Sequence, residues 1–168
     1  MAAKKKSPTA SSDPNERVIA TNRQARRDYE VLDSIEAGIS LKGSEVKSMR
    51  EAKVTLADAF GRLDDSGEMW LLGLHVAPYS HSGQADSHEP DRPRKLLLHR
   101  HEIDRWRPRV DQDRLSLIPL SLYLKGGRVK VEMALARGRK SHDKREAIAR
   151  RDADREAARA MAQRNRGE

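Results

Sequence analysis

Residues 115–135 read LSLIPLSLYLKGGRVKVEMAL, and this stretch decides the fold. Apolar side chains alternate with others on both sides of a glycine pair, Gly126-Gly127: Ile118, Leu120, Leu122 and Leu124 precede it, and Val129, Val131, Met133 and Leu135 follow it. A period of two is typical of a half-buried strand, and two glycines suit a tight two-residue turn. The stretch therefore predicts a β-hairpin. Pro119 should lie at an edge or a bulge, because proline cannot donate to a strand ladder.

Weaker patterns of the same kind lie upstream of this hairpin. Residues 29–41 suggest two short strands or one bent strand, and residues 54–63 and 69–76 suggest a second hairpin around the turn at 65–67. Short helices are predicted at 44–50 and 101–106. About six short strands with small helices between them predict a mainly β chain, with an antiparallel barrel favoured over a sandwich.

Charge is concentrated at the C-terminal end of the chain. The net charge is +8 over 168 residues, and residues 137–168 alone carry 11 cationic and 6 anionic side chains, whereas residues 18–136 carry 19 and 18. A nearly neutral body with a basic extension indicates an RNA or DNA partner, although a basic tail can also serve solubility alone. Ile148 and Met161 are the only large apolar residues beyond Ser141. We therefore expect this tail to be disordered alone and helical on its partner.

Composition also limits the location and the chemistry. The chain has no cysteine, no apolar run long enough for a membrane span and no secretory signal, which predicts a cytoplasmic protein without membrane contact. No nucleotide-binding or hydrolase motif occurs, so neither an enzyme nor a cofactor is expected. The spacing His99-x-His101 leaves a metal site or a histidine-dependent nuclease as an alternative, without a thiolate or a catalytic spacing to support it.

Three features are suited to binding nucleic acid. Arg23, Arg26 and Arg27 place three guanidinium groups within two turns, and a guanidinium can both fork onto phosphate and stack on bases. Arg92, Arg94 and Lys95 form a second basic cluster, at the exit of a long loop over 78–94. Glu36 stands near a predicted strand end, where it is either a surface anion or an acceptor for a base amino group or a ribose hydroxyl.

Several longer segments resemble one family. NRQARRDYEVLDSIEAGISLKGSEVKSMREAKVTL (22–56), HEPDRPRKLLLHRHEI (88–103), LIPLSLYLKGGRVKVEMALARGRKSHDKRE (117–146) and RRDADRE (150–156) are similar to the SmpB family, the bacterial small protein B that binds tmRNA, also called SsrA RNA. The resemblance covers roughly residues 18–160 in order. It implies a six-stranded antiparallel OB-like β-barrel with about three short helices, expected as a monomer. Its parts would be a flexible N-terminal arm at 1–17, the RNA-binding barrel at 18–137 and the basic tail at 138–168.

The same resemblance implies a function in trans-translation without catalysis. The barrel would bind the tRNA-like part of tmRNA, support its charging by alanyl-tRNA synthetase, and accompany it with elongation factor Tu and GTP to stalled ribosomes. There the tail would enter the decoding centre and the empty mRNA channel, and His142 would stack on a base of small-subunit rRNA. The stalled peptide would then be tagged for proteolysis.

The residues expected to serve each role fall into two sets. For tmRNA they are Asn22, Arg23, Arg26, Arg27, Glu36, Lys47, Lys95, Arg128 and Lys130. For the decoding centre they are Gly138, Arg139, Lys140, His142, Asp143, Lys144 and Arg145. A general oligonucleotide-binding or ribosomal protein that lacks a rescue function is the alternative, and deletion of the tail separates the two: a general binder should mainly lose affinity.

Overall fold

The computed structural model describes residues 15–81, 83, 85 and 87–164, with residues 141–144 described by their backbone only. The expected N-terminal arm therefore lies almost entirely outside the described residues. Helices and strands follow one another in this order: β1 (Glu16–Thr21), α1 (Arg23–Asp28), β2 (Tyr29–Ile39), α2 (Gly43–Arg50), β3 (Val54–Thr55), β4 (Phe60–Leu63), β5 (Met69–Leu72), β6 (His75–Val76), β7 (Arg94–Leu97), α3 (Arg100–Gln112), β8 (Ser116–Lys125), β9 (Arg128–Gly138) and α4 (Ser141–Arg164).

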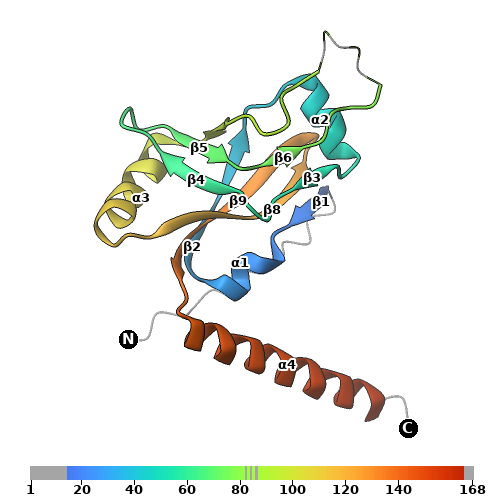
Figure 1. Cartoon of the computed structure of the whole chain (residues 1–168), viewed down its shortest axis with the longest axis vertical. Coiled ribbons are helices and arrows are strands. Elements are labelled where there is room, and N and C mark those ends of the chain that lie inside the picture. The colour runs from blue at the N-terminus through green and yellow to red at the C-terminus, as the bar shows by residue number, and fades with distance from the viewer. Residues whose placement is uncertain (1–14, 82, 84, 86, 165–168) are drawn as a thin grey trace.

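The main sheet contains seven strands in the order β1-β8-β4-β5-β7-β2-β9, and β8 also pairs with β9. The pairings therefore run from β8 through β4, β5, β7, β2 and β9 and return to β8, with β1 added on the outside (Figure 1). Every strand pair is antiparallel, and β3 and β6 form a separate small sheet. The predicted mainly β, antiparallel architecture is confirmed. The described residues hold nine strands and four helices, more than the six and three expected.

The hairpin at 115–135 is the best-predicted part of the chain. Strands β8 and β9 pair in register up to Lys125 and Arg128, and the turn residues Gly126 and Gly127 have φ angles of 57° and 76°. Only glycine adopts two successive angles of this sign at little cost. On β9 the four alternating residues from Val129 to Leu135 are all buried in the main core, as predicted.

The predicted single apolar face of β8 is wrong. A register shift between Pro119 and Ser121 interrupts the strand, so the expected bulge at Pro119 is confirmed. Beyond the bulge Leu122 packs in the main core, whereas Ile118 before the bulge and Leu120 within it pack in a second, smaller cluster with Ala25. One extra residue in a strand moves the side chains that follow it to the other face, and the alternation read from the sequence did not include that step.

The fold begins earlier in the chain than the strand pattern indicated. Strand β1 starts at Glu16 and pairs with β8, and helix α1 follows it directly, although neither element was predicted. Ala25 is the one residue that α1 buries. A helix with a single buried residue has no apolar periodicity in its sequence, and this is why α1 was not predicted. Residues 29–39 form one continuous strand with a register shift after Val31, which matches the predicted bent strand.

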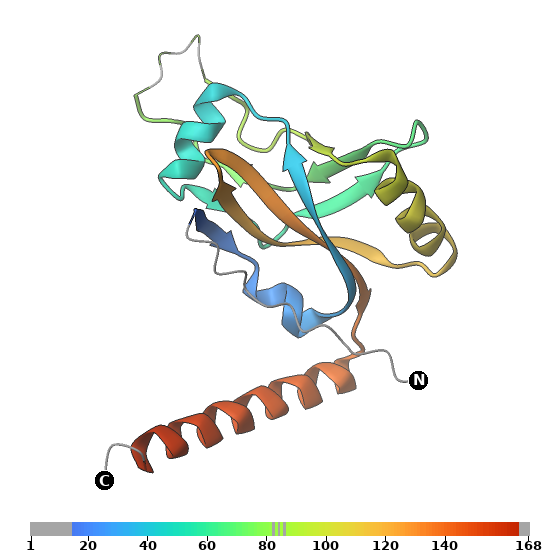
Figure 2. The same ribbon diagram turned by 180° about the vertical axis from the view of Figure 1, so that it is seen from behind.

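The remaining helices lie around the sheet. Helix α3 is longer than predicted and buries Trp106 completely, which fits the expectation that this residue packs in the core. Helix α4 extends away from the body below α1, at the end opposite α2 (Figures 1 and 2). Its Ile148 and Met161 are exposed, and the expected disorder of the isolated tail stays a prediction. Within the described part of the chain, no helix is both long and apolar enough to cross a membrane.

Candidate nucleic-acid interface

Asn22 fixes helix α1 to the bulge of β8. Its side-chain oxygen accepts a hydrogen bond from the Ala25 amide at 3.1 Å, and its amide nitrogen donates to the Pro119 carbonyl at 3.1 Å. The side chain is only 5% exposed. Both of its polar groups are therefore used inside the protein, and Asn22 orients the helix instead of presenting its own amide.

The arginines that Asn22 orients are exposed. Arg23, Arg26 and Arg27 all lie on the solvent side of α1, and Arg27 contacts the neighbouring Asp28 at 3.3 Å. Both side chains of this ion pair are partly exposed, and such pairs contribute little free energy. The Arg27 guanidinium is therefore available to an RNA phosphate. These three predicted residues therefore form one cationic helix surface.

The beginning of the tail lies next to this surface. Strands β2 and β9 stay paired as far as Tyr29 and Gly138, and the Arg139 amide donates to the Asp28 carbonyl at 2.9 Å. A hollow of about 480 Å³ lies where α1, the ends of β2 and β9, and α4 meet, and its lining is mostly charged: Arg26, Glu30, Arg137, Gly138, Arg139, Glu146, Ala147, Arg150, Arg151 and Asp154. The structure thus brings Arg26 together with Gly138 and Arg139.

Later tail residues are placed less completely. Lys140 is exposed in the short link before α4, and Arg145 is exposed on the helix. The backbone of residues 142–144 lies in the first turns of α4. Their side chains, including the imidazole predicted to stack on rRNA, lie outside the described residues.

A second group of predicted residues shares one groove on the body. Glu36, Lys95, Arg128 and Lys130 line a groove of about 1050 Å³ to which β2, β7, β9, α2 and α3 contribute. Lys95 is held there by an ion pair with Glu68 at 2.5 Å, and both side chains are 40% exposed. Three cations on one concave surface suit a phosphate backbone.

Glu36 on β2 is the one acidic residue in the predicted RNA-binding set. Two side chains of β8, which is two strands away in the sheet, hold its carboxylate in place. The Tyr123 hydroxyl donates to its Oε2 at 2.5 Å, and Lys125 Nζ lies 3.3 Å from the same atom. Burial alone would raise the pKa of Glu36, but the hydrogen bonds from Tyr123 and Lys125 and the charges of Lys125 and Lys130 outweigh it and hold the pKa below its ordinary value. Burial and the neighbouring Glu36 raise the pKa of Tyr123. The pair is thus a carboxylate and a neutral phenol at neutral pH.

Lys47 lies apart from both groups. It is exposed on α2, and its ammonium is 5.5 Å from the ring centroid of Tyr79. Together with Lys42 and His81 these residues line a separate hollow of about 440 Å³. The structure therefore distributes the predicted cations over three surfaces of the molecule.

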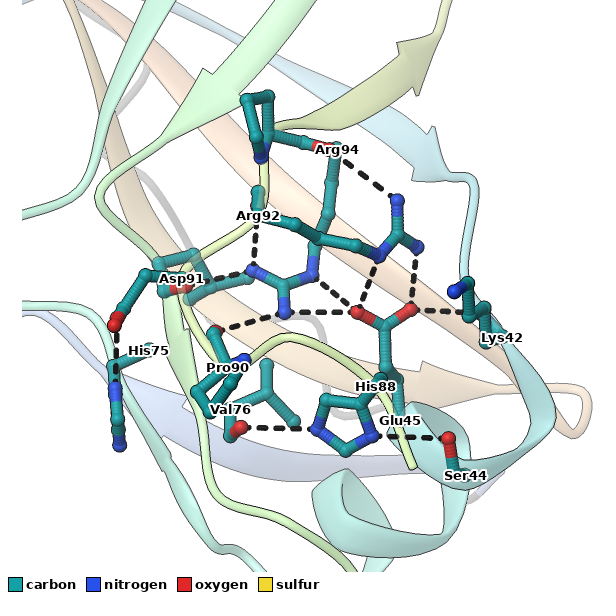
Figure 3. Close-up of polar contacts among 12 residues, drawn as sticks. Lys42, Ser44, Glu45, His75, Val76, His88, Pro90, Asp91, Arg92 and Arg94 are labelled. Atoms are coloured by element: carbon teal, nitrogen blue, oxygen red, sulfur yellow. Dashed lines mark hydrogen bonds and ion pairs between the residues drawn. The ribbon is translucent and has the colours of Figure 1, made fainter. Parts of the chain in front are cut away.

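Two arginines of the predicted second basic cluster have a structural role instead. Figure 3 shows both guanidinium groups converging on the carboxylate of Glu45, which is fully buried on α2. Arg92 binds both of its oxygens, at 2.8 and 2.5 Å, and Arg94 binds Oε1 at 2.8 Å. Arg94 is 0% exposed and also donates to the carbonyls of Leu74, Arg92 and Pro90. No local sequence pattern indicated that a glutamate on a helix would neutralise this cluster.

Several of the described histidines make contacts within the protein, and Nδ1 of His75 lies 2.7 Å from Oδ1 of Asp91. His88 is buried, with Nδ1 bonded to the Ser44 hydroxyl and Nε2 to the Val76 carbonyl, so it ties the loop to α2 (Figure 3). The rings of His99 and His101 stack with centroids 5.6 Å apart at the start of α3. Among the residues that the structure describes, no group of three or more His, Cys, Asp or Glu side chains is placed to hold a metal ion.

Comparison with known proteins points to one family. The family model described as "SmpB protein" matches residues 19–163. A curated relative from Mycolicibacterium vanbaalenii (strain PYR-1), named "SsrA-binding protein", is 54% identical over 162 residues, which are 96% of this chain and 97% of the relative. A relative of the same name from Mycobacterium sp. (strain KMS) is 53% identical and covers 99% of both chains.

A solved structure is also similar. The chain it contains is 47% identical to this one, with a TM-score of 0.62, and the match covers 77% of this chain and 93% of the other. Its description reads "tmRNA-SmpB: a journey to the center of the bacterial ribosome". With a family model that spans most of its length and relatives above 50% identity over nearly all of it, this chain belongs to the SmpB family.

Proposed function

We propose that this protein binds SsrA RNA, or tmRNA, and acts with it in trans-translation on the ribosome. The observation that carries the proposal is that relatives named "SsrA-binding protein" align with 96–99% of the chain, body and tail included. The arrangement of charge supports it, because Lys95, Arg128 and Lys130 share a groove on the body, the arginines of α1 form a cationic surface, and a basic helix extends from the body. The protein would act by binding, without catalysis of its own.

We propose that the body and the tail bind different partners. The ring of paired strands would be an OB-like barrel over residues 18–137 that binds the tRNA-like part of the RNA through α1 and the groove. Asn22 would contribute by positioning α1, and Lys47 would contact a separate part of the RNA. The tail from Gly138 would enter the decoding centre and the empty mRNA channel, where His142 would stack on an rRNA base. Elongation factor Tu with GTP and alanyl-tRNA synthetase would act on the same RNA in the cytoplasm.

RNA binding tests the first half of this proposal. Labelled SsrA RNA is titrated with the full chain at 50–200 mM salt, beside an unrelated structured RNA of equal length. We expect tight binding of SsrA RNA that weakens by roughly 10³-fold or more over this range, as several phosphate contacts require, and much weaker binding of the control. Equal affinity for both RNAs would contradict the proposal and favour a general oligonucleotide-binding protein.

A further inference from the structure

Phe60 is the one phenylalanine of the chain, and it lies on the surface of β4. It is 47% exposed and lines a hollow of about 650 Å³, to which α1, β4, the end of α3 and the start of β8 contribute. Val110 and the buried Leu115 and Ile118 also line this hollow, which we call the Phe60 hollow. An exposed aromatic side chain among apolar neighbours is typical of a surface that contacts a partner protein.

Two glycines fix the backbone that carries Phe60. At Gly61 an added Cβ would lie 2.7 Å from Cβ of Leu117, and at Gly73 it would lie 2.5 Å from the carbonyl oxygen of Asp58. Strand β4 and the segment before it therefore pack against their neighbours with no room for a side chain at these two positions. A surface that is already formed loses little conformational entropy on binding, so the hollow is suited to docking.

The charge around the Phe60 hollow is opposite in sign to that of the whole chain. Asp58 and Asp111 line it and are exposed, and within the described part of the chain neither forms an ion pair. Asp28, which pairs with Arg27, and one cation, Arg62, line it as well. The net charge of the lining is therefore negative, although the chain carries +8. Asp111 lies in the last turn of α3, where the helix dipole adds to the negative potential.

Helix α1 separates this hollow from the cationic tail junction. Gln24 and Asp28 line the Phe60 hollow, whereas Arg26 lines the hollow beside α4. Residues four positions apart share one side of a helix, so α1 presents different charges to the two hollows. Carboxylates repel phosphate, so the charge of the Phe60 hollow favours a cationic polypeptide over an RNA backbone.

A lysine or arginine side chain matches both properties of the hollow. Its methylene groups can pack on the ring of Phe60 and on Val110, while its charged end pairs with Asp58 or Asp111. A cation over an aromatic ring adds a further attraction.

We infer that the Phe60 hollow binds an extended lysine- or arginine-rich segment of a ribosomal protein. The inference rests on the proposed function, which places the chain on the ribosome, and adds a protein partner to it. Proteins that bind rRNA carry basic segments of this kind, so the chemistry of the hollow is met at that location. The body would then bind SsrA RNA with its cationic surfaces and a ribosomal protein with this anionic one.

Reversal of one charge in the full chain distinguishes a protein partner from rRNA. Purified stalled ribosomes are titrated with the chain bound to SsrA RNA. Asp58→Lys should weaken ribosome binding by about tenfold or more, because it places a cation against a cationic segment. Asp65→Lys, the same change at an exposed position that does not line the hollow, should stay within about twofold of the wild type. If the surface contacts rRNA instead, Asp58→Lys should bind more tightly, and equal or tighter binding would overturn the inference.

A second variant tests the aromatic contact without relying on charge. Phe60→Ser removes an exposed side chain, so the urea midpoint should change little, and ribosome binding should weaken several-fold. Affinity for SsrA RNA alone should be unchanged in Asp58→Lys and in Phe60→Ser. A parallel loss of SsrA RNA binding would overturn the inference, because it would assign the surface to the RNA or to folding.

Photo-cross-linking identifies the partner. Phe60 is replaced by p-benzoylphenylalanine, the complex with SsrA RNA is irradiated on purified stalled ribosomes, and the cross-linked site is located by mass spectrometry. We expect a cross-link to a lysine- or arginine-rich segment of a ribosomal protein. Cross-links only to rRNA, only to the chain's own Lys4–Lys6, or to nothing would overturn the inference. If the wild type shows no preference for SsrA RNA and no ribosome binding, the proposed function itself fails.

Discussion

At the residue scale, the buried ion pairs around Glu45 determine how the long loop is attached. Glu45 on α2 is 0% exposed and is neutralised by Arg92, at the end of the long loop, and by Arg94, the first residue of β7. A buried charge that loses its partner is strongly destabilising, whereas an exposed pair such as Glu51 with Lys53 contributes little. The two arginines therefore stabilise the fold, although their sequence context suggests binding residues.

Glu45→Gln should lower the free energy of unfolding by about 3 kcal/mol or more, because Arg94 stays buried without its counter-ion. Urea unfolding measures the loss, and Glu51→Gln, as the exposed control, should stay within about 0.5 kcal/mol of the wild type. A change below about 1 kcal/mol in Glu45→Gln would contradict this role.

The same residue predicts part of the pH dependence of stability. Burial tends to raise the pKa of Glu45, but the bonds from Arg92, Lys42 and Arg94 hold it below its ordinary value of 4.5. A lowered folded-state pKa stabilises the protein fully above 4.5, and this stabilisation is lost as the pH falls through the lower value. The acid-induced loss of stability should therefore be smaller in Glu45→Gln than in the wild type.

Asn22 offers a second test at this scale. Asn22→Ala removes a helix N-cap and leaves the Pro119 carbonyl without its side-chain donor, so it should cost about 1–2 kcal/mol and weaken hydrogen-exchange protection of α1. Asn22→Ser keeps a capping oxygen and should fall between wild type and alanine. Gln24→Ala, at an exposed position on the same helix, is the matched control. Equal stability of all three variants would show that the Asn22 cap does not stabilise the protein.

At the element scale, the hairpin and the tail show how far the sequence predicts the structure. Alternation and the glycine pair identified β8, β9 and their turn, because these signals are local. The bulge at Pro119 was expected. It places Ile118 and Leu120 on the face of β8 that α1 covers, and this could not be foreseen because α1 was not predicted. Elements with one buried residue have no periodic signal, and α1 is such an element.

The candidate site was predictable to a similar degree. The cations of the groove and of α1 could be named from sequence and resemblance, and the structure places Lys95, Arg128 and Lys130 together. The Tyr123 contact with Glu36 joins residues 87 positions apart, so no local pattern could reveal it. Likewise, only the tertiary fold brings Glu45 to Arg92 and Arg94.

Helix α4 should exchange its amide hydrogens quickly in the free protein. Its two large apolar side chains, Ile148 and Met161, are 40% and 69% exposed, so little packing stabilises a helix that is marginal alone. Hydrogen-exchange mass spectrometry should show rapid exchange over residues 145–164, strong protection over 129–135, and protection of the tail when ribosomes are added. Strong protection of the free tail would contradict the expectation of folding on the partner.

At the scale of the whole molecule, strands β2 and β9 connect the groove to the start of the tail. Glu36 and Lys130 lie in the groove near one end of this strand pair, and Tyr29 and Gly138 lie at the other end, where the tail begins. Gly138 lies eight positions after Lys130, which is roughly 26 Å along the strand at about 3.3 Å per residue. Figures 1 and 2 show α4 leaving the body at that end. A rigid two-strand connection of this kind would hold the tail at a fixed distance from the bound RNA.

Peptide tagging on stalled ribosomes tests this account most directly. The full chain is compared with a variant that stops after Lys140, which keeps the β2–β9 pairing and the bond from the Arg139 amide to Asp28. With SsrA RNA and stalled ribosomes present, we predict that the full chain supports tagging, and that the truncated chain binds SsrA RNA within a few-fold of the full chain but supports no tagging. Tagging by the truncated chain, or no tagging by the full chain, would contradict the account.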